Sequence, residues 1–252
     1  MHIRVRAVLI CGFVLFQFQS SPAQLPGREA QPYEYQRSIG ISAEYANDSS
    51  HILLGAVGNR RLAGIGADYS RRLLKSRYVD WSWVVEAQPM LLEEDPMEKQ
   101  DVVYTSGQSN EHDYLPSLSN ANCLTITVHF DYVDSSTLIP YDGTTTLTCS
   151  TRWTYTGGIN PLGQRLNFAP RHRVQPYLVG NGGFLASTND VPVAGSSFNF
   201  SLELGGGVEW YTSAKRSWSV EAHYHHMSPV NFREYNYGLD TVVYKATYRF
   251  GH

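Results

Sequence analysis

The sequence predicts an all-β fold, an antiparallel transmembrane β-barrel of about eight strands. Three observations predict it. Apolar and polar residues alternate with a period of two in several segments, short and long connections follow one another in turn, and the N-terminus has the layout of an export signal. After that signal there is no run of about 18 apolar residues, so we expect no membrane-spanning helix.

The first 23 residues have the order of a secretory signal peptide. A basic start with Arg4 and Arg6 precedes a mostly apolar run over 7–18, and the small residues of Ser21-Pro22-Ala23 follow. An apolar run of this length is too short to cross a bilayer. We therefore expect a signal peptide over 1–23, a lead segment over 24–36 and a barrel over 37–252 in the outer membrane of the cell.

The alternation is longest over 198–210, where one face carries apolar residues and the other carries polar residues that include Glu203 and Glu209. The same pattern predicts strands over 39–45, 63–69, 79–87 and 242–250, and we add strands near 153–167, 174–187 and 217–228. A secreted β-sandwich alternates in the same way, with its apolar face inward. The export signal and the order of the connections favour the barrel.

Short connections are expected at 73–77, 168–173 and 212–217, and long ones at 47–60, 93–152, 188–196 and 229–239. Short periplasmic turns opposite long extracellular loops are typical of outer-membrane barrels. In the longest connection, 124–133 and 144–153 look extended around Tyr141-Asp142-Gly143, a turn signal. They predict either a hairpin above the membrane or two further barrel strands, which would give ten.

Charge and cysteine content narrow the function classes. The net charge is −3 and no segment is polybasic, which argues against nucleic acid as a partner. Cys11 is removed with the signal peptide, and Cys123 and Cys149 remain. An even pair in an exported protein is typical of one disulfide, although two unpaired thiols stay possible.

Most charged residues of the strands fall on the polar face, and in a narrow barrel we expect them to fill the interior as a paired network. These are Glu44, Asp68, Glu86, Glu203, Glu209, Glu221, Lys245 and Arg249. His223 and His225 share this face, while His226 points the other way. Two histidines with no clearly spaced carboxylate or thiol are a weak metal signal, so we expect neither a metal nor a cofactor.

His226, Ser228 and Asp240 have the parity of the apolar, outward face and flank the connection 229–239. Ionisable groups at a lipid boundary are costly unless they pair, which makes them candidates for function. A serine, a histidine and an acid together activate a hydroxyl for acyl transfer. Alternatively, the apolar band ends near residue 225 and the three are ordinary rim residues.

The chain resembles the lipid A 3-O-deacylase (PagL-like) family, some of whose members are described as acyloxyacyl hydrolases. The resemblance rests on His226-Met227-Ser228 followed by Gly238-Leu239-Asp240. It is supported by Gly157-Gly158-Ile159-Asn160-Pro161-Leu162-Gly163, Asn167-Phe168-Ala169-Pro170, Gln175-Pro176-Tyr177 and Phe198-Asn199-Phe200. It covers roughly 153–250 well and the first three strands loosely.

The resemblance implies an eight-stranded barrel with a catalytic site on its lipid-facing outside. It implies Ser228 as nucleophile, His226 as general base and Asp240 as the orienting acid. The substrate would be the ester-linked acyl chain at position 3 of lipid A in the lipopolysaccharide of the outer leaflet. No cofactor is implied.

The chain departs from the family pattern after the serine, where it has Pro229-Val230-Asn231. The family usually has Asn directly after the serine, and proline offers no N–H to an oxyanion. Asn231 is the candidate replacement donor. An alternative function is therefore a barrel with a weak or lost site, acting as a structural or surface-interaction protein through its long second loop.

Overall fold

A computed structural model describes residues 33–49, 52–55, 57–105, 110–116, 125–192, 195–229 and 238–252, of which 112–116 are described by backbone alone. The expected signal peptide, Cys123 and Asn231 lie outside these residues. Within them, no helix is long and apolar enough to cross a membrane.

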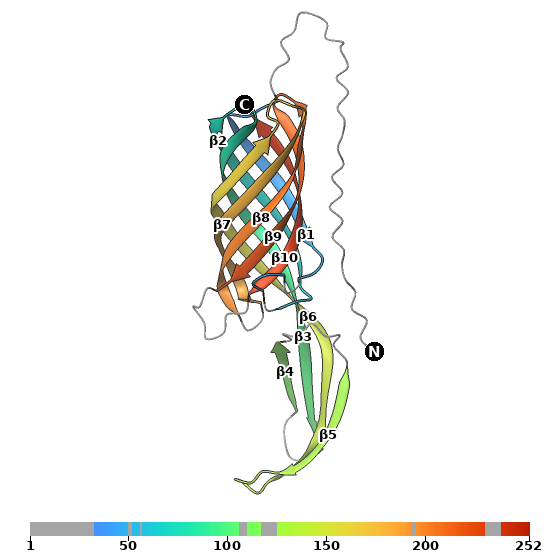
Figure 1. The fold of residues 1–252 in the computed structure, drawn as a ribbon. Coiled ribbons are helices and arrows are strands. Elements are labelled where there is room, and N and C mark those ends of the chain that lie inside the picture. The colour runs from blue at the N-terminus through green and yellow to red at the C-terminus, as the bar shows by residue number, and fades with distance from the viewer. Residues whose placement is uncertain are drawn as a thin grey trace, which may run out of the picture. The chain divides into compact units, whose positions relative to one another are not determined.

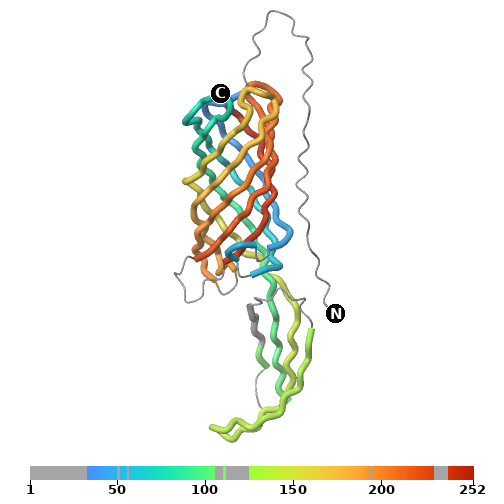
Figure 2. Tube along the Cα trace, in the orientation of Figure 1, coloured from blue at the N-terminus to red at the C-terminus, as the bar shows by residue number. Residues whose placement is uncertain are grey.

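Ten antiparallel strands form one sheet, and eight of them close a barrel (Figures 1 and 2). The strands are β1 Arg37–Ala46, β2 Arg61–Lys75, β3 Val79–Tyr104, β4 Glu111–Pro116, β5 Ile126–Val133, β6 Pro140–Phe168, β7 Val174–Val191, β8 Ser196–Ser213, β9 Arg216–Ser228 and β10 Leu239–Gly251. The ring runs β3-β2-β1-β10-β9-β8-β7-β6, and a β3–β6 pairing closes it. The predicted transmembrane β-barrel of eight strands is confirmed.

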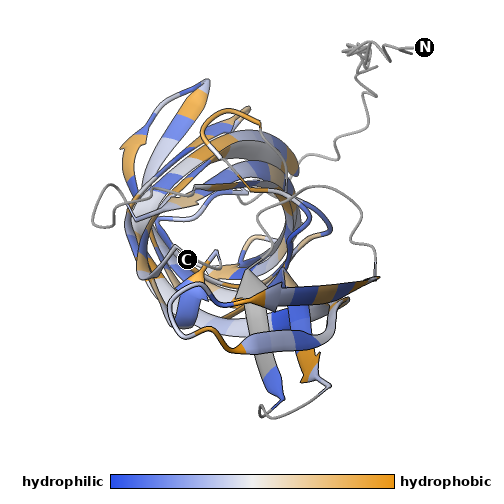
Figure 3. Ribbon diagram, turned by 90° about the horizontal axis from the view of Figure 1, so that it is seen from below, coloured by the Kyte–Doolittle hydropathy of each residue, from blue (hydrophilic) through white to orange (hydrophobic). Residues whose placement is uncertain are grey.

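Polar and apolar residues alternate along the barrel strands (Figure 3). Because successive side chains of a strand point to opposite faces, this alternation separates an inward set from an outward set. Inward positions carry buried polar side chains, and outward positions carry exposed apolar ones. Exposed outward residues include Ile39, Ile41, Tyr45, Leu178, Leu204, Val220, Val242 and Tyr244. An apolar exterior around a polar interior is the pattern of a membrane barrel.

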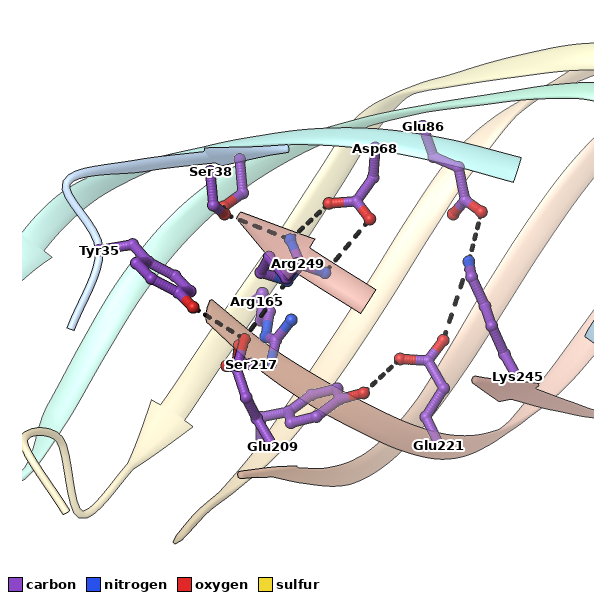
Figure 4. A network of polar contacts seen from close by, with 12 residues as sticks. Tyr35, Ser38, Asp68, Glu86, Arg165, Glu209, Ser217, Glu221, Lys245 and Arg249 are labelled. Atoms are coloured by element: carbon purple, nitrogen blue, oxygen red, sulfur yellow. Dashed lines mark hydrogen bonds and ion pairs between the residues drawn. The ribbon is translucent and has the colours of Figure 1, made fainter. Parts of the chain in front are cut away.

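Ion pairs fill the interior and link strands that are far apart in the sequence (Figure 4). Arg249 of β10 pairs with Asp68 of β2 and lies 3.7 Å from Glu209 of β8, which also pairs with Arg165 of β6 at 2.7 Å. Lys245 pairs with Glu86 of β3. The predicted interior network is confirmed, and its charges compensate one another where water is scarce.

The two ends of the barrel differ. We call one end the turn end; it carries the connections 76–78, 169–173 and 214–215 and the C-terminus. The residues before β1 pack there as well. The Tyr35 hydroxyl donates to Ser217 Oγ at 3.0 Å, and the Gln36 N–H donates to the His252 carbonyl at 2.7 Å. The opposite, loop end is closed by a buried apolar cluster of Ala46, Val57, Leu62, Leu91, Leu185, Val191, Met227, Leu239 and Val243.

At the loop end β3 and β6 continue past their barrel neighbours. β3 pairs with β2 up to Glu94 but with β6 as far as Tyr104. β4 and β5 flank this extension, so the distal sheet has the order β4-β3-β6-β5. The expected connection over 93–152 is thus largely strand, and the two additional strands lie outside the ring.

The predicted turn at Tyr141-Asp142-Gly143 is wrong, because these residues lie inside β6 and pair with β5. The chain reverses over 134–139 instead. There the Asp134 carboxylate accepts hydrogen bonds from the Ser136 hydroxyl and from the backbone N–H groups of Ser136 and Thr137, an Asx-type turn. The Ser136 hydroxyl bond is the largest cause of a lowered pKa of Asp134.

Candidate active site

His226 of β9 and Asp240 of β10 are direct cross-strand partners at the loop end of the barrel. Histidine Nδ1 lies 2.7 Å from Asp240 Oδ1. Because an ionised carboxylate only accepts hydrogen bonds, Nδ1 carries the proton and Nε2 is left as the basic nitrogen. Both side chains have the outward parity that the sequence predicted.

Asp240 accepts hydrogen bonds from several donors besides His226. The Tyr224 hydroxyl donates to Oδ1 at 2.8 Å. The backbone N–H groups of Leu53 and Leu54, in the β1–β2 connection, donate to Oδ2 at 2.7 and 2.8 Å, and the N–H of Gly55 also donates to this carboxylate. These bonds leave Asp240 with 0% exposure although it has the outward parity. A carboxylate with this many donors is fixed in orientation and stays ionised.

Two glycines allow this close packing. A Cβ on Gly55 would lie 2.6 Å from the Asp240 backbone nitrogen, and a Cβ on Gly238 would lie 2.7 Å from Cε1 of His226. Both contacts are shorter than real Cβ atoms make, so a larger residue would displace the loop or the imidazole. The site therefore depends on glycine on both sides.

Ser228 is the last residue of β9 and is buried. It follows His226 by two residues on the same face, and its cross-strand partner is Phe200 of β8. Side chains two residues apart on one strand start from Cα atoms about 6.5 Å apart. Pro229, also buried, follows directly and has no N–H. Asn231, the oxyanion candidate, lies outside the described residues.

Sequence reasoning missed Tyr224 and the segment 52–55. Tyr224 had a usable signal, since it precedes His226 by two residues and shares its parity. The segment 52–55 had none in the strand periodicity, because a loop that folds back onto a strand leaves no regular pattern. Its signal was the apolar run Ile52-Leu53-Leu54 inside a connection.

The other histidines of β9 belong to the interior. His225 Nε2 lies 3.0 Å from Ser201 Oγ, and His223 Nδ1 lies 3.3 Å from Glu221 Oε1. Over the residues that the structure describes, no group of three or more His, Cys, Asp or Glu side chains is placed to hold a metal ion. The split between an inward pair and an outward His226 is as predicted.

Cys149 lies on β6 in the distal sheet, at a position that pairs with Glu98 of β3. It is bonded in a disulfide. Cys123 lies outside the described residues, so the pairing of Cys123 with Cys149 stays a prediction.

Solved structures with similar folds include the outer-membrane enzyme PagL (13% identity, 83% of this chain and 97% of that chain, TM-score 0.47). The Neisserial surface protein NspA matches at 14% identity over 86% and 97% of the two chains, with a TM-score of 0.41. OprG from Pseudomonas aeruginosa matches at 11% identity over 88% and 98%, with a TM-score of 0.40.

A comparison with curated protein sequences finds no match. The model of one protein family, described as lipid A 3-O-deacylase (PagL), matches residues 124–249, half of the chain. The matched region contains His226, Ser228 and Asp240. The chain belongs to the lipid A 3-O-deacylase (PagL) family.

Proposed function

We propose that the protein is an outer-membrane serine esterase that removes the ester-linked acyl chain at position 3 of lipid A. The observation that supports this most directly is the 2.7 Å bond between His226 Nδ1 and Asp240 Oδ1, made on the outward face of the barrel with Ser228 two residues further along. Family membership supports lipid A as the substrate.

The proposed reaction is an acyl transfer in two halves. Ser228 Oγ attacks the ester carbonyl carbon while His226 Nε2 takes the hydroxyl proton. The protonated imidazole then returns this proton to the departing sugar oxygen, which leaves an acyl-serine. Water, deprotonated by the same imidazole, attacks the acyl-serine, and the imidazole passes that proton to Ser228 Oγ as the C–O bond breaks and the fatty acid leaves. Asp240 stabilises the charged imidazole and holds its tautomer throughout.

The cost of the arrangement supports a functional interpretation. An ionised carboxylate on the outward face of a membrane barrel is expensive even when paired. Ordinary rim residues would face water, whereas Asp240 is fully buried beneath donors from a separate loop. A purely structural role would be met at lower cost by an apolar residue.

The location of the site fits a lipid substrate. We place the loop end outside the cell, since long loops are extracellular in such barrels and short turns are periplasmic. His226, Ser228 and Asp240 then lie at the level of the outer leaflet, where lipopolysaccharide resides. Substrate would reach them by lateral diffusion in the membrane.

Pro229 supports a second candidate, a barrel of the same fold with little or no activity. A backbone N–H after the nucleophile is missing, and loss of one oxyanion donor costs on the order of a hundredfold in rate. Such a protein would act at the surface through the distal sheet of β3, β4, β5 and β6.

The test is mass spectrometry of lipid A from cells that express the native protein, Ser228→Ala or the matched control Ser219→Ala. Ser219 lies on the same strand, buried and inward. The proposal expects loss of one hydroxyacyl chain with the native protein and the control but not with Ser228→Ala. Loss with all three would remove Ser228 from the mechanism, and unchanged lipid A with folded native barrel would favour the second candidate.

A further inference from the structure

The β1–β2 connection presents three consecutive apolar side chains away from the protein. Ile52, Leu53 and Leu54 are 40%, 75% and 63% exposed. An exposed run of three large aliphatic residues is unfavourable in water and marks a contact with another apolar phase or a partner.

The backbone N–H groups of the two leucines, in contrast, are already hydrogen-bonded within the protein. The N–H groups of Leu53 and Leu54 donate to Asp240 Oδ2, as described above. The hydrogen bonds fix the main chain of this segment against the start of β10, so its side chains point away from that strand.

The connection is anchored on both sides of the segment. Before it, Ser49 forms a bridge with Thr241, and the Thr241 hydroxyl donates to the Asp48 carbonyl at 2.8 Å. After it, Val57 forms a bridge with Leu239 and is completely buried in the apolar cluster of the loop end. Ile52–Gly55 is thus a projecting segment of the loop that is fixed to β10 on both sides.

The projection continues an apolar surface. From Asp240 toward the turn end, the outward face of β10 carries exposed Val242 and Tyr244. Further in the same direction, Val220 of β9, the partner of Ala246, is also exposed. These residues belong to the lipid-facing band of the barrel. The leucine side chains therefore lie next to the surface that contacts the acyl chains of the outer leaflet.

We propose that Ile52–Gly55 is a lipid-docking segment: its side chains insert among outer-leaflet acyl chains while its backbone holds the carboxylate of Asp240. Contact with the acyl region and orientation of the acid are then performed by one piece of chain. The meaning of this for catalysis rests on the proposed esterase function, whereas the lipid contact itself does not.

The lipid contact is tested by fluorescence. A polarity-sensitive dye is attached to the new cysteine of Leu53→Cys and, in a second protein, of Leu138→Cys. The labelling is done without a reductant, so that the native disulfide stays intact. Each protein is placed in vesicles whose phospholipids carry a spin-label quencher on the acyl chain. Leu138 is the matched control, because it is 76% exposed but lies in the distal turn. We expect strong quenching at position 53 and little at 138.

Equal quenching at the two positions, or quenching at 53 by a water-soluble quencher instead, overturns the inference whether or not the protein hydrolyses lipid A. Quenching confined to position 53 without any hydrolysis by the native protein leaves the docking segment in place and rejects the esterase. The two hypotheses are thus separable.

The coupling is tested with Leu53→Ser/Leu54→Ser on two substrates, a lipid with long acyl chains in vesicles and a short-chain ester soluble in water. We expect the rate on the long-chain lipid to fall about tenfold more than the rate on the short ester, because the two leucines no longer bury apolar surface among the acyl chains. Leu73→Ser/Leu74→Ser, which changes two exposed leucines at the turn end, leaves both rates unchanged. An equal fall on the two substrates contradicts the coupling.

Discussion

The hydroxyl of Tyr224 donates to Asp240 Oδ1 at 2.8 Å, the same oxygen that lies 2.7 Å from His226 Nδ1. Tyr224 and His226 also stack with their rings 9° from parallel, so the tyrosine fixes both partners of the pair. Tyr224 is therefore a positioning residue for the proposed reaction.

Tyr224→Phe removes one donor to a charged acceptor, an interaction that contributes about 1.5 kcal/mol. We expect kcat on lipid A to fall about tenfold with KM unchanged, because the hydroxyl that is removed donates to Asp240. Steady-state kinetics in micelles measure both constants. Tyr244→Phe, on the outward face of β10, serves as the control; a rise in KM alone would contradict this role.

Asp240→Asn preserves the size of the side chain but replaces one acceptor oxygen with a donor. If the new NH₂ group takes the place of Oδ1, it faces His226 and Tyr224, and the imidazole loses the bond that fixes its tautomer. If it takes the place of Oδ2, it faces the amides of Leu53 and Leu54, and the loop loses its anchor. We expect kcat to fall by roughly 10⁴-fold with the barrel still folded. Activity within tenfold of native would show that the acid is dispensable.

Gly55→Ala places a methyl group against the Asp240 backbone and pushes the β1–β2 connection outward. A misplacement of about 1 Å at the acid costs on the order of a hundredfold in rate. Gly182→Ala is the matched change, since its Cβ would meet nothing closer than Leu162 at 3.9 Å. Rates are compared at equal amounts of folded barrel. Similar rates for the two variants would show that the packing of Gly55 against Asp240 does not position the acid.

Lys245→Met leaves Glu86 and Glu221 inside the barrel without their shared cation. Breaking a buried ion pair from one side destabilises by about 3–5 kcal/mol. We expect the barrel to unfold at a lower urea concentration. Electrophoresis that separates folded from unfolded barrel measures this midpoint. Adding Glu86→Gln should recover part of the loss, and no recovery would mean that packing, and not charge, is responsible.

The disulfide of Cys149 gives a prediction that does not depend on catalysis. Alkylation of the exported protein without reduction should modify neither Cys123 nor Cys149, and peptide mapping should recover them as one linked pair. A free thiol at Cys123 would show that Cys149 has a different partner.

Strand parity made much of the site predictable. A period of two, read along 218–228 and 240–250, was enough to put His226, Ser228 and Asp240 on one face and His223 and His225 on the other. The turn over 134–139 was missed because Asp142-Gly143 carries the stronger turn signal. Gly143 serves another purpose: a Cβ there would lie 2.5 Å from the Val103 carbonyl and 2.9 Å from the Phe130 ring.

The donors to Asp240 connect opposite ends of the sequence, since Leu53 and its acceptor are 187 positions apart. β1 and β10, the first and last strands of the chain, pair directly in the ring, so the loop after β1 reaches the acid only when both strands are in place. A chain still in transit across the periplasm carries the three proposed catalytic residues within 15 positions of one another, yet lacks the loop amides that hold Asp240. The proposed hydrolytic activity would thus be the last property acquired during assembly, and it would be confined to molecules already inserted in their final membrane.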